Sequence, residues 1–165
     1  MPKIKQKNLC EINGVLYMSP SSAGDLWNMK YQAVSQACKA GRVVGACLDS
    51  GNKWIIPTKA IKPLDMETIR QVLISTLALK NKPSSVSTLS LEDAKKVYGY
   101  LMDTGFVERC DNITLETLKN LILTEKGMQT ATSGKISDID WVNAVTTLIQ
   151  VVASVMTIWQ AIKTI

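Results

Sequence analysis

Two short, largely apolar segments lie near the start of the chain, residues 9–12 and 15–18. These segments flank Asn13 and Gly14, and an Asn-Gly pair supplies the two positive φ angles that a tight type I′ turn needs. The pattern therefore predicts a β-hairpin.

The residues after the hairpin have the signals of two short helices. Ser19 is expected to cap the first helix, with Pro20 at its first position, and the helix should end near Trp27. A tight turn leads into a second helix over about residues 30–40, which Gly41 terminates. The side chains expected to face the core are Ala23, Leu26, Trp27, Val34, Ala37 and Cys38.

A two-stranded wing is predicted after the helices. Its strands are expected at residues 43–47 and 54–56, on either side of a polar turn at residues 49–52, and Cys47 and Trp54 are expected in the core. Two short helices around a tight turn, followed by a wing, are typical of a unit that reads DNA. Residues 1–63 are therefore predicted to form a winged helix-turn-helix domain.

Residues 66–133 have mixed signals. Apolar residues recur at helical spacing near the start of this region, and Ser90 is expected to cap a helix that runs to about Thr104. Residues 106–109 look extended, while residues 114–121 fit either a strand or a helix. The prediction is a small α+β domain, either an interaction domain or a second winged helix.

Residues 136–165 are predicted to form a long C-terminal helix that has no charged side chain from Trp141 to Ile162. Apolar residues with a 3-4 spacing form a seam along it: Val145, Leu148, Val152, Val155, Trp159 and Ile162. A polar stripe of Asn, Thr, Ser and Gln favours an oligomer core or packing within the chain. The alternative is a C-terminal membrane anchor, because 22 helical residues reach roughly 33 Å.

Charge is unevenly distributed along the chain. Residues 1–65 contain nine basic and four acidic side chains, whereas residues 66–165 contain ten of each. The net charge of +5 therefore lies entirely in the first part of the chain, and a localised basic surface is what a polyanionic partner requires.

The composition excludes several kinds of chemistry. The chain has no histidine, and its four cysteines are far apart with no CxxC pair. This excludes the usual zinc spacings and nucleophile systems that depend on histidine. We therefore expect no enzyme activity, no catalytic residue, no metal and no cofactor. The absence of a signal peptide at the start favours a cytoplasmic protein with reduced thiols.

The run SPSSAGDLWNMKYQAVSQACKAGRVVGACLDSGNKWIIPTKAI resembles the helix-turn-helix of the excisionase and MerR-like group, over about residues 16–63. Its markers are the small-residue first helix, the KAGRV segment after the second helix and the WIIP strand. The segments DTGFVER and LILTEKG are similar to parts of PadR and MarR-type winged helices. The resemblance implies a mostly α fold with a small hairpin and wing, and double-stranded DNA as the partner.

The candidate DNA-binding residues follow from this placement. They lie on the second helix and on the wing: Lys30, Tyr31, Gln32, Ser35, Gln36, Lys39, Arg42, Asn52 and Lys53. Glutamine suits adenine in the major groove, whereas Tyr, Ser and Lys more often contact phosphate.

The sequence thus favours a sequence-specific DNA-binding protein, such as a prokaryotic or phage transcriptional regulator or mobile-element accessory factor. It would act as a homo-oligomer formed through the C-terminal helix. The alternatives are a membrane-associated protein whose N-terminal module binds DNA or a protein, and a winged module that is a protein-binding adaptor.

Overall fold

A computed structural model describes residues 9–81, 90–133 and 144–163, which combine helices with a small antiparallel sheet. The chain divides into two units. Unit 1 comprises residues 1–63 together with 159–165, and unit 2 comprises residues 64–158. The division thus falls after residue 63, and the described residues of the C-terminal segment, 144–163, are shared between the two units.

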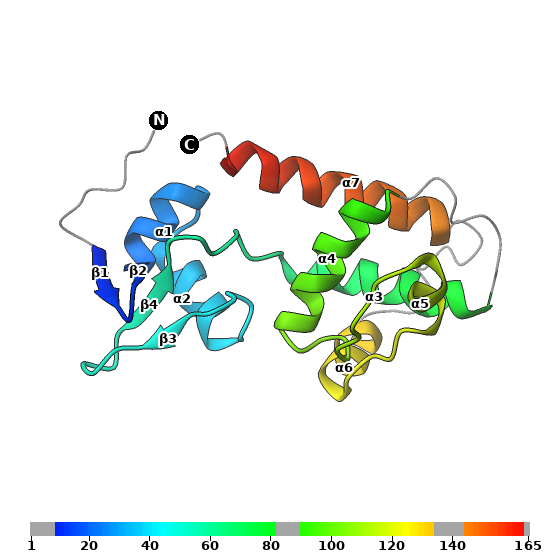
Figure 1. The fold of residues 1–165 in the computed structure, drawn as a ribbon, viewed down its shortest axis with the longest axis horizontal. Helices are drawn as coiled ribbons and strands as arrows, with labels where there is room; N and C mark the ends of the chain where they lie inside the picture. Colours follow the sequence, from blue (N-terminus) through cyan, green and yellow to red (C-terminus); the bar gives the residue numbers. More distant parts are fainter. Residues whose placement is uncertain (1–8, 82–89, 134–143, 164–165) are drawn as a thin grey trace. The chain divides into compact units, whose positions relative to one another are not determined.

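The sheet of unit 1 has four strands in the order β1-β2-β4-β3 (Figure 1). They are β1 (Leu9–Ile12), β2 (Val15–Met18), β3 (Cys47–Leu48) and β4 (Trp54–Pro57). The predicted hairpin is present, because Asn13 and Gly14 have φ angles of 51° and 77° and Ile12 pairs with Val15.

Two helices pack on this sheet, α1 (Pro20–Trp27) and α2 (Tyr31–Lys39). The Ser19 hydroxyl caps α1 by accepting a hydrogen bond from the amide of Ser22 at 3.2 Å, and Asn28 ends the helix in a left-handed conformation. One core forms between the helices and the sheet. Its fully or nearly fully buried side chains are Met18, Ala23, Trp27, Val34, Ala37, Cys38, Val43 and Ile56.

The hairpin of β3 and β4 stands where the wing is predicted and is referred to by that name below. Its first strand is shorter than the predicted residues 43–47. Only Cys47 and Leu48 are extended, and residues 43–46 form a turn that is closed by a hydrogen bond from the Ala46 amide to the Val43 carbonyl. Gly45 explains the difference, because its φ is +76° and a Cβ there would lie 2.9 Å from Cγ of Pro57. The chain approaches β4 too closely at this point for an ordinary strand residue.

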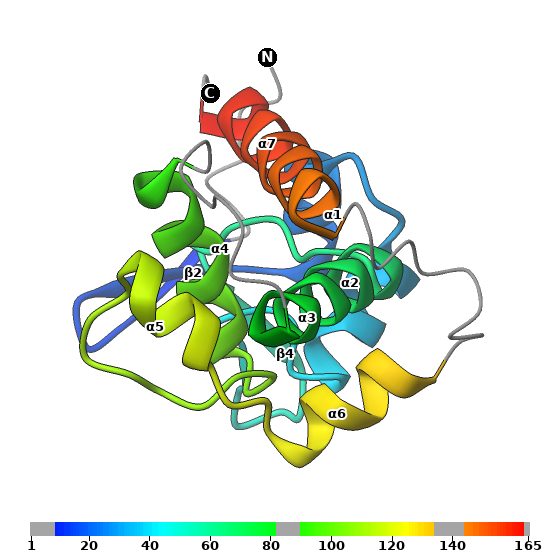
Figure 2. The same cartoon turned by 90° about the vertical axis from the view of Figure 1, so that its right-hand side faces the viewer.

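Unit 2 is mostly helical. It contains α3 (Met66–Asn81), α4 (Leu91–Asp103), α5 (Leu115–Asn120) and α6 (Glu125–Thr132). The other helices surround α3, which packs against α5 and α6 (Figure 2). Most side chains from Ile69 to Leu79 are buried as a result, so α3 is the central helix of this unit.

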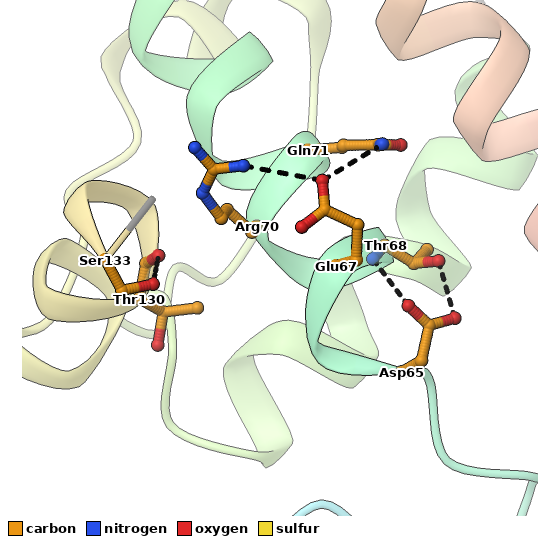
Figure 3. A network of polar contacts seen from close by, with 7 residues as sticks. All are labelled: Asp65, Glu67, Thr68, Arg70, Gln71, Thr130 and Ser133. Atoms are coloured by element: carbon orange, nitrogen blue, oxygen red, sulfur yellow. Dashed lines mark hydrogen bonds and ion pairs between the residues drawn. The ribbon is translucent and has the colours of Figure 1, made fainter. Parts of the chain in front are cut away.

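Short polar contacts fix the start of α3. Asp65 accepts hydrogen bonds from the amide and the hydroxyl of Thr68, both at 2.8 Å, and Glu67 accepts from Arg70 at 3.4 Å and from Gln71 at 3.3 Å (Figure 3). Partial burial tends to raise the pKa of Asp65. The hydrogen bonds that its carboxylate accepts, those from Thr68 first among them, outweigh this effect, so the pKa lies below its usual value. Asp65 therefore acts as an ionised cap on the helix.

The segment after α4 contains little β-structure. Val107 forms an isolated bridge with Leu123, and residues 115–120 are helical because Thr114 and Thr117 form a reciprocal capping box. Gly127 is required here, since a Cβ at this position would overlap the carbonyl oxygen of Phe106. The expected extended segment at residues 106–109 is thus limited to the bridge, and the open choice at 114–121 is resolved as a helix.

The last helix, α7, runs from Ala144 to Lys163. Four residues of its predicted seam, Leu148, Val152, Val155 and Trp159, are at most 6% exposed within the single chain. Ile162 is half-buried and packs on the core of unit 1, while the side chain of Val145 lies outside the described part. An oligomer formed through this seam would require these side chains to leave their present contacts.

The membrane alternative for the same helix rested on residues 141–162, of which 141–143 are outside the described residues. Within the described part of the chain, no helix combines the length and the apolar character needed to cross a membrane.

Candidate functional site

Helix α2 separates a buried face from an exposed one. Val34 and Ala37 are fully buried and Cys38 is 3% exposed, so these three anchor the helix to the core. Four candidate residues lie on the opposite side and are exposed: Tyr31, Gln32, Gln36 and Lys39. The helix therefore presents one aromatic, two amide and one ammonium group together, without an acidic side chain among its nine residues.

Lys30 stands immediately before α2 at the N-cap position, where its side chain forms no capping hydrogen bond. The side chain is exposed. The first amides of α2 consequently have no side-chain cap, and a positive charge lies beside them. Both features suit an anionic group near the start of the helix.

Ser35 does not fit its predicted role. It was expected on the outer face, but it is only partly exposed, and its hydroxyl oxygen is buried without a hydrogen-bond partner in the described structure. Its place in the helix explains this, because it follows the buried Val34 and lies on the boundary between the two faces. The hydroxyl of Ser35 is therefore not presented to a partner on the surface of α2.

The tip of the wing is ordered by Asp49. Its carboxylate accepts hydrogen bonds from the amides of Gly51 and Lys53, both at 2.8 Å, and the Asp49 amide donates to the Lys53 carbonyl at 2.9 Å. Asn52 takes a positive φ of 58° to complete the turn. Asn52 and Lys53 are both exposed on this fixed turn, so their side chains project from a defined backbone.

Arg42 follows α2, and Cys47 is the first residue of β3. Arg42 is half-buried, and its amide donates to the carbonyl of Ala37 at 2.9 Å, which holds the chain against the end of α2. Cys47 was expected in the core but is exposed, because only two residues of β3 pair with β4 and both are exposed. Trp54, on β4, is only partly buried against the core.

The three cysteines of unit 1 differ in burial. Burial raises the pKa of Cys38 to about 11, and a backbone hydrogen bond opposes only part of that rise. Cys38 is thus an inert core residue, whereas Cys10 and Cys47 are exposed thiols on the sheet.

Three lysines of the candidate site have no acidic partner. Lys30, Lys39 and Lys53 form no ion pair with any described residue, and the four ion pairs of the described structure all lie in unit 2. Lys59 has the same character, since it is exposed and unpaired among the described residues of unit 1. Lys59 is not among the candidate DNA-binding residues predicted from the sequence, although it is one of the nine basic residues in residues 1–65.

Unit 2 has a shallow cleft of about 200 Å³, lined in part by Glu108, Arg109, Cys110 and Glu116. Pockets that bury small ligands are usually larger, about 300–1,000 Å³, and Arg109 is already bound to Asp103 at 2.8 Å. Among the described residues, no group of three Cys, Asp or Glu side chains is placed to hold a metal ion. The candidate site is therefore the surface of α2 and the wing.

No known protein family, no curated protein and no solved structure matches this chain.

Proposed function

We propose that unit 1 binds double-stranded DNA with sequence preference, through α2 and the wing formed by β3 and β4. The observation that carries this proposal is the exposed face of α2, which combines Gln32 and Gln36 with Lys39. Two helices joined by a tight turn and followed by a β-hairpin are the arrangement of winged helix-turn-helix proteins. The role in the cell that fits this activity is a transcriptional regulator or a mobile-element accessory factor.

The lysines supply the sequence-independent part of the binding. Lys30, Lys39 and Lys53 each bring a positive charge that no acidic side chain of the described residues neutralises. Contact with phosphate releases counterions from the DNA, and this release favours binding at low salt. The turn at the wing tip is already fixed in the folded chain, so less conformational entropy is lost when Lys53 contacts the sugar-phosphate backbone of the DNA.

The glutamines supply the part of the binding that depends on the DNA sequence. Gln32 and Gln36 are one helical turn apart, about 6 Å along the helix axis, which matches roughly two base-pair steps. A glutamine amide can donate to N7 and accept from N6 of adenine in the major groove. Tyr31, which is 55% exposed, lies next to Gln32 at the start of the helix and can donate its hydroxyl to a phosphate.

The test is selection of duplexes from a random library by the full chain, followed by titration of the best duplex and of a scrambled duplex. The expected result is a preferred site that contains A·T pairs and is bound more tightly than the scrambled sequence. No binding of either duplex at low salt would overturn the proposed function.

The double substitution Gln32→Ala and Gln36→Ala separates base reading from general affinity. It should cost about 1–3 kcal/mol for each true base contact on the preferred site and leave the scrambled duplex almost unaffected. Gln71→Ala is the matched control, because Gln71 is an exposed helical glutamine of unit 2 that bonds to Glu67. An equal loss on both duplexes would contradict the assignment of base reading to Gln32 and Gln36.

A further inference from the structure

Among the described residues, no strand pairs with the outer edge of β1. β1 and β3 are the two edges of the sheet, but β3 has only two residues, whereas all four residues of β1 pair regularly with β2. A regular edge strand presents unpaired main-chain N–H and C=O groups, which are complementary to another extended strand. Natural edges are usually protected by a bulge, a proline or charged side chains, especially lysines; within Leu9–Ile12, β1 has no bulge, proline or lysine, and Glu11 is its one charged residue.

The hairpin geometry identifies which groups face outward. Ile12 and Val15 close the two-residue turn and pair directly, so this pair exchanges main-chain hydrogen bonds. Hydrogen-bonded and non-hydrogen-bonded pairs alternate along an antiparallel ladder. Cys10 therefore directs its N–H and C=O toward Tyr17 on β2, while Leu9 and Glu11 direct theirs away from β2.

One face of the hairpin is apolar and exposed. Leu9 pairs with Met18, which is 1% exposed, so this pair faces the core of unit 1. The opposite face contains Cys10, Ile12, Val15 and Tyr17, because successive residues alternate sides. Ile12 and Val15 are 42% and 43% exposed, and no charged residue lies on this face. The solvent face of an antiparallel sheet is normally polar.

We propose that β1 pairs with β1 of a second copy of this chain, around a two-fold axis that places Cys10 opposite the partner's Cys10. A second copy fits because it presents the same free edge and the same apolar face, and an antiparallel pairing of identical strands is self-complementary. The two sheets then form one continuous sheet, with the apolar faces on the same side.

Register follows from the alternation of side chains. Residues directly opposite each other share a face, so the two-fold axis must pass through a residue and not between two residues. Centring the pairing on Glu11 would set two carboxylates opposite each other, which is destabilising. Centring the pairing on Cys10 places Leu9 of each copy opposite Glu11 of the other copy. Leu9 and Glu11 are the residues whose main-chain N–H and C=O groups face outward, so these groups can bond across the new pair.

The interface is small. Within the described strand, the register pairs three residues of each copy, Leu9 to Glu11, and the interface falls below the roughly 1,200 Å² of a standard stable interface. We therefore expect a dimer whose fraction rises with protein concentration. This pairing depends neither on the seam of α7 nor on DNA binding.

The first experiment measures the mass of the full chain in reducing buffer over a range of concentrations, for the natural sequence and for Glu11→Pro. The N–H of Glu11 points away from β2, so proline there leaves the hairpin ladder intact and removes a donor from the outer edge. We expect a concentration-dependent dimer for the natural sequence and a monomer for Glu11→Pro, with unchanged circular dichroism. A monomer at every concentration, or an equal dimer fraction in both, would overturn the proposal.

The second experiment tests the pairing through the thiol of Cys10. Directly opposed residues of a non-hydrogen-bonded pair have Cα atoms about 4.5 Å apart, within the range of about 4.4–6.8 Å that a disulfide spans. Diamide oxidises the two Cys10 thiols to a disulfide and takes up their two hydrogens.

We compare Cys47→Ser, which keeps Cys10, with Cys10→Ser, which keeps Cys47 as an exposed thiol at the other edge of the sheet. The Cys10-containing variant should form a covalent dimer at least about tenfold faster, because association raises the effective thiol concentration. Equal rates would mean random collision and would overturn the proposal.

Discussion

The two units of this chain manage charge in opposite ways. In unit 2, basic side chains pair with nearby carboxylates: Arg70–Glu67 at 3.4 Å, Lys95–Glu92 at 3.6 Å, Lys96–Asp93 at 3.9 Å and Arg109–Asp103 at 2.8 Å. In unit 1, Lys30, Lys39 and Lys53 are exposed and have no such partner among the described residues. Exposed ion pairs add little stability, but they neutralise a surface locally. The first part of the chain thus differs both in its excess of basic side chains and in the lack of acidic partners for Lys30, Lys39 and Lys53, and the proposed DNA binding rests on these two features.

Helix α7 contributes to both units. Its residues up to Ile158 belong to unit 2, and those from Trp159 onward belong to unit 1. The indole Nε1 of Trp159 donates to the carbonyl of Lys62 at 3.1 Å, and Ile162 packs on the core that supports α1 and α2. The C-terminal turn thus completes the fold of the unit that carries the candidate DNA-binding face.

The largest predicted effect comes from Trp159→Ala. The side chain is 6% exposed, and removing a buried tryptophan costs about 3–5 kcal/mol of the free energy of unfolding. Ile158→Ala is the control, because Ile158 is its neighbour on α7 and is 41% exposed; we expect a cost of less than about 1 kcal/mol there. Denaturant unfolding of both variants checks this, and equal losses would contradict the role of Trp159.

The next effect contrasts the charges of the two units. Lys39→Glu with Lys53→Glu should weaken duplex binding about 100-fold at low salt, since each reversal removes a phosphate contact and adds repulsion. Lys95→Glu with Lys96→Glu changes the formal charge equally in unit 2 and should leave the affinity unchanged. Anisotropy titrations compare the two variants. If both weaken binding to the same extent, net charge and not the surface of unit 1 governs the interaction.

A smaller predicted effect is a loss of folding stability at alkaline pH, which arises from a tyrosine in the core of unit 2. Tyr98 is fully buried, and its hydroxyl lies 2.6 Å from the Thr76 hydroxyl. Burial raises the pKa of Tyr98 to about 12, and the hydrogen bond to Thr76 opposes only part of that rise. The folded state thus keeps a proton that the unfolded chain loses above pH 10, so the stability from this group is complete below pH 10 and is lost as the pH rises toward 12.

Tyr98→Phe should remove this loss of stability between pH 10 and 12 and cost about 1 kcal/mol at neutral pH for the missing hydrogen bond. Tyr31→Phe is the control, because Tyr31 is 55% exposed and should leave the pH profile unchanged. Denaturant midpoints measured across this pH range provide the test. An unchanged profile in Tyr98→Phe would show that other groups govern alkaline stability.

Local signals predicted much of unit 1. The Asn13-Gly14 turn, the Ser19 cap and the spacing of Val34, Ala37 and Cys38 are all determined within a few residues of sequence, and each appears as expected. The wing was less predictable. The turn at Gly45 depends on its contact with Pro57, a residue twelve positions away. Local sequence signals alone predict a strand from Val43 to Cys47, and they do not include this tertiary contact.

The environments of α7 and of Ser35 could not be predicted from helical spacing alone. The polar stripe of α7 was compatible with several environments, and only the folded chain determines that Leu148 and Val155 are fully buried. Ser35 shows the same limit within the candidate site, because helical spacing cannot tell whether a residue at the edge of a face keeps its hydroxyl exposed.

The central claim is that the unpaired lysines of unit 1 contact DNA phosphates, and the salt dependence of duplex binding by the full chain tests it most directly. Contacts from Lys30, Lys39 and Lys53 predict that log K falls with log salt with a slope of about −3 or steeper, and that Lys53→Ala reduces its magnitude by about 1. Lys95→Ala, in unit 2, should leave the slope unchanged. A slope near zero, or equal slopes for the natural sequence and Lys53→Ala, would contradict this account.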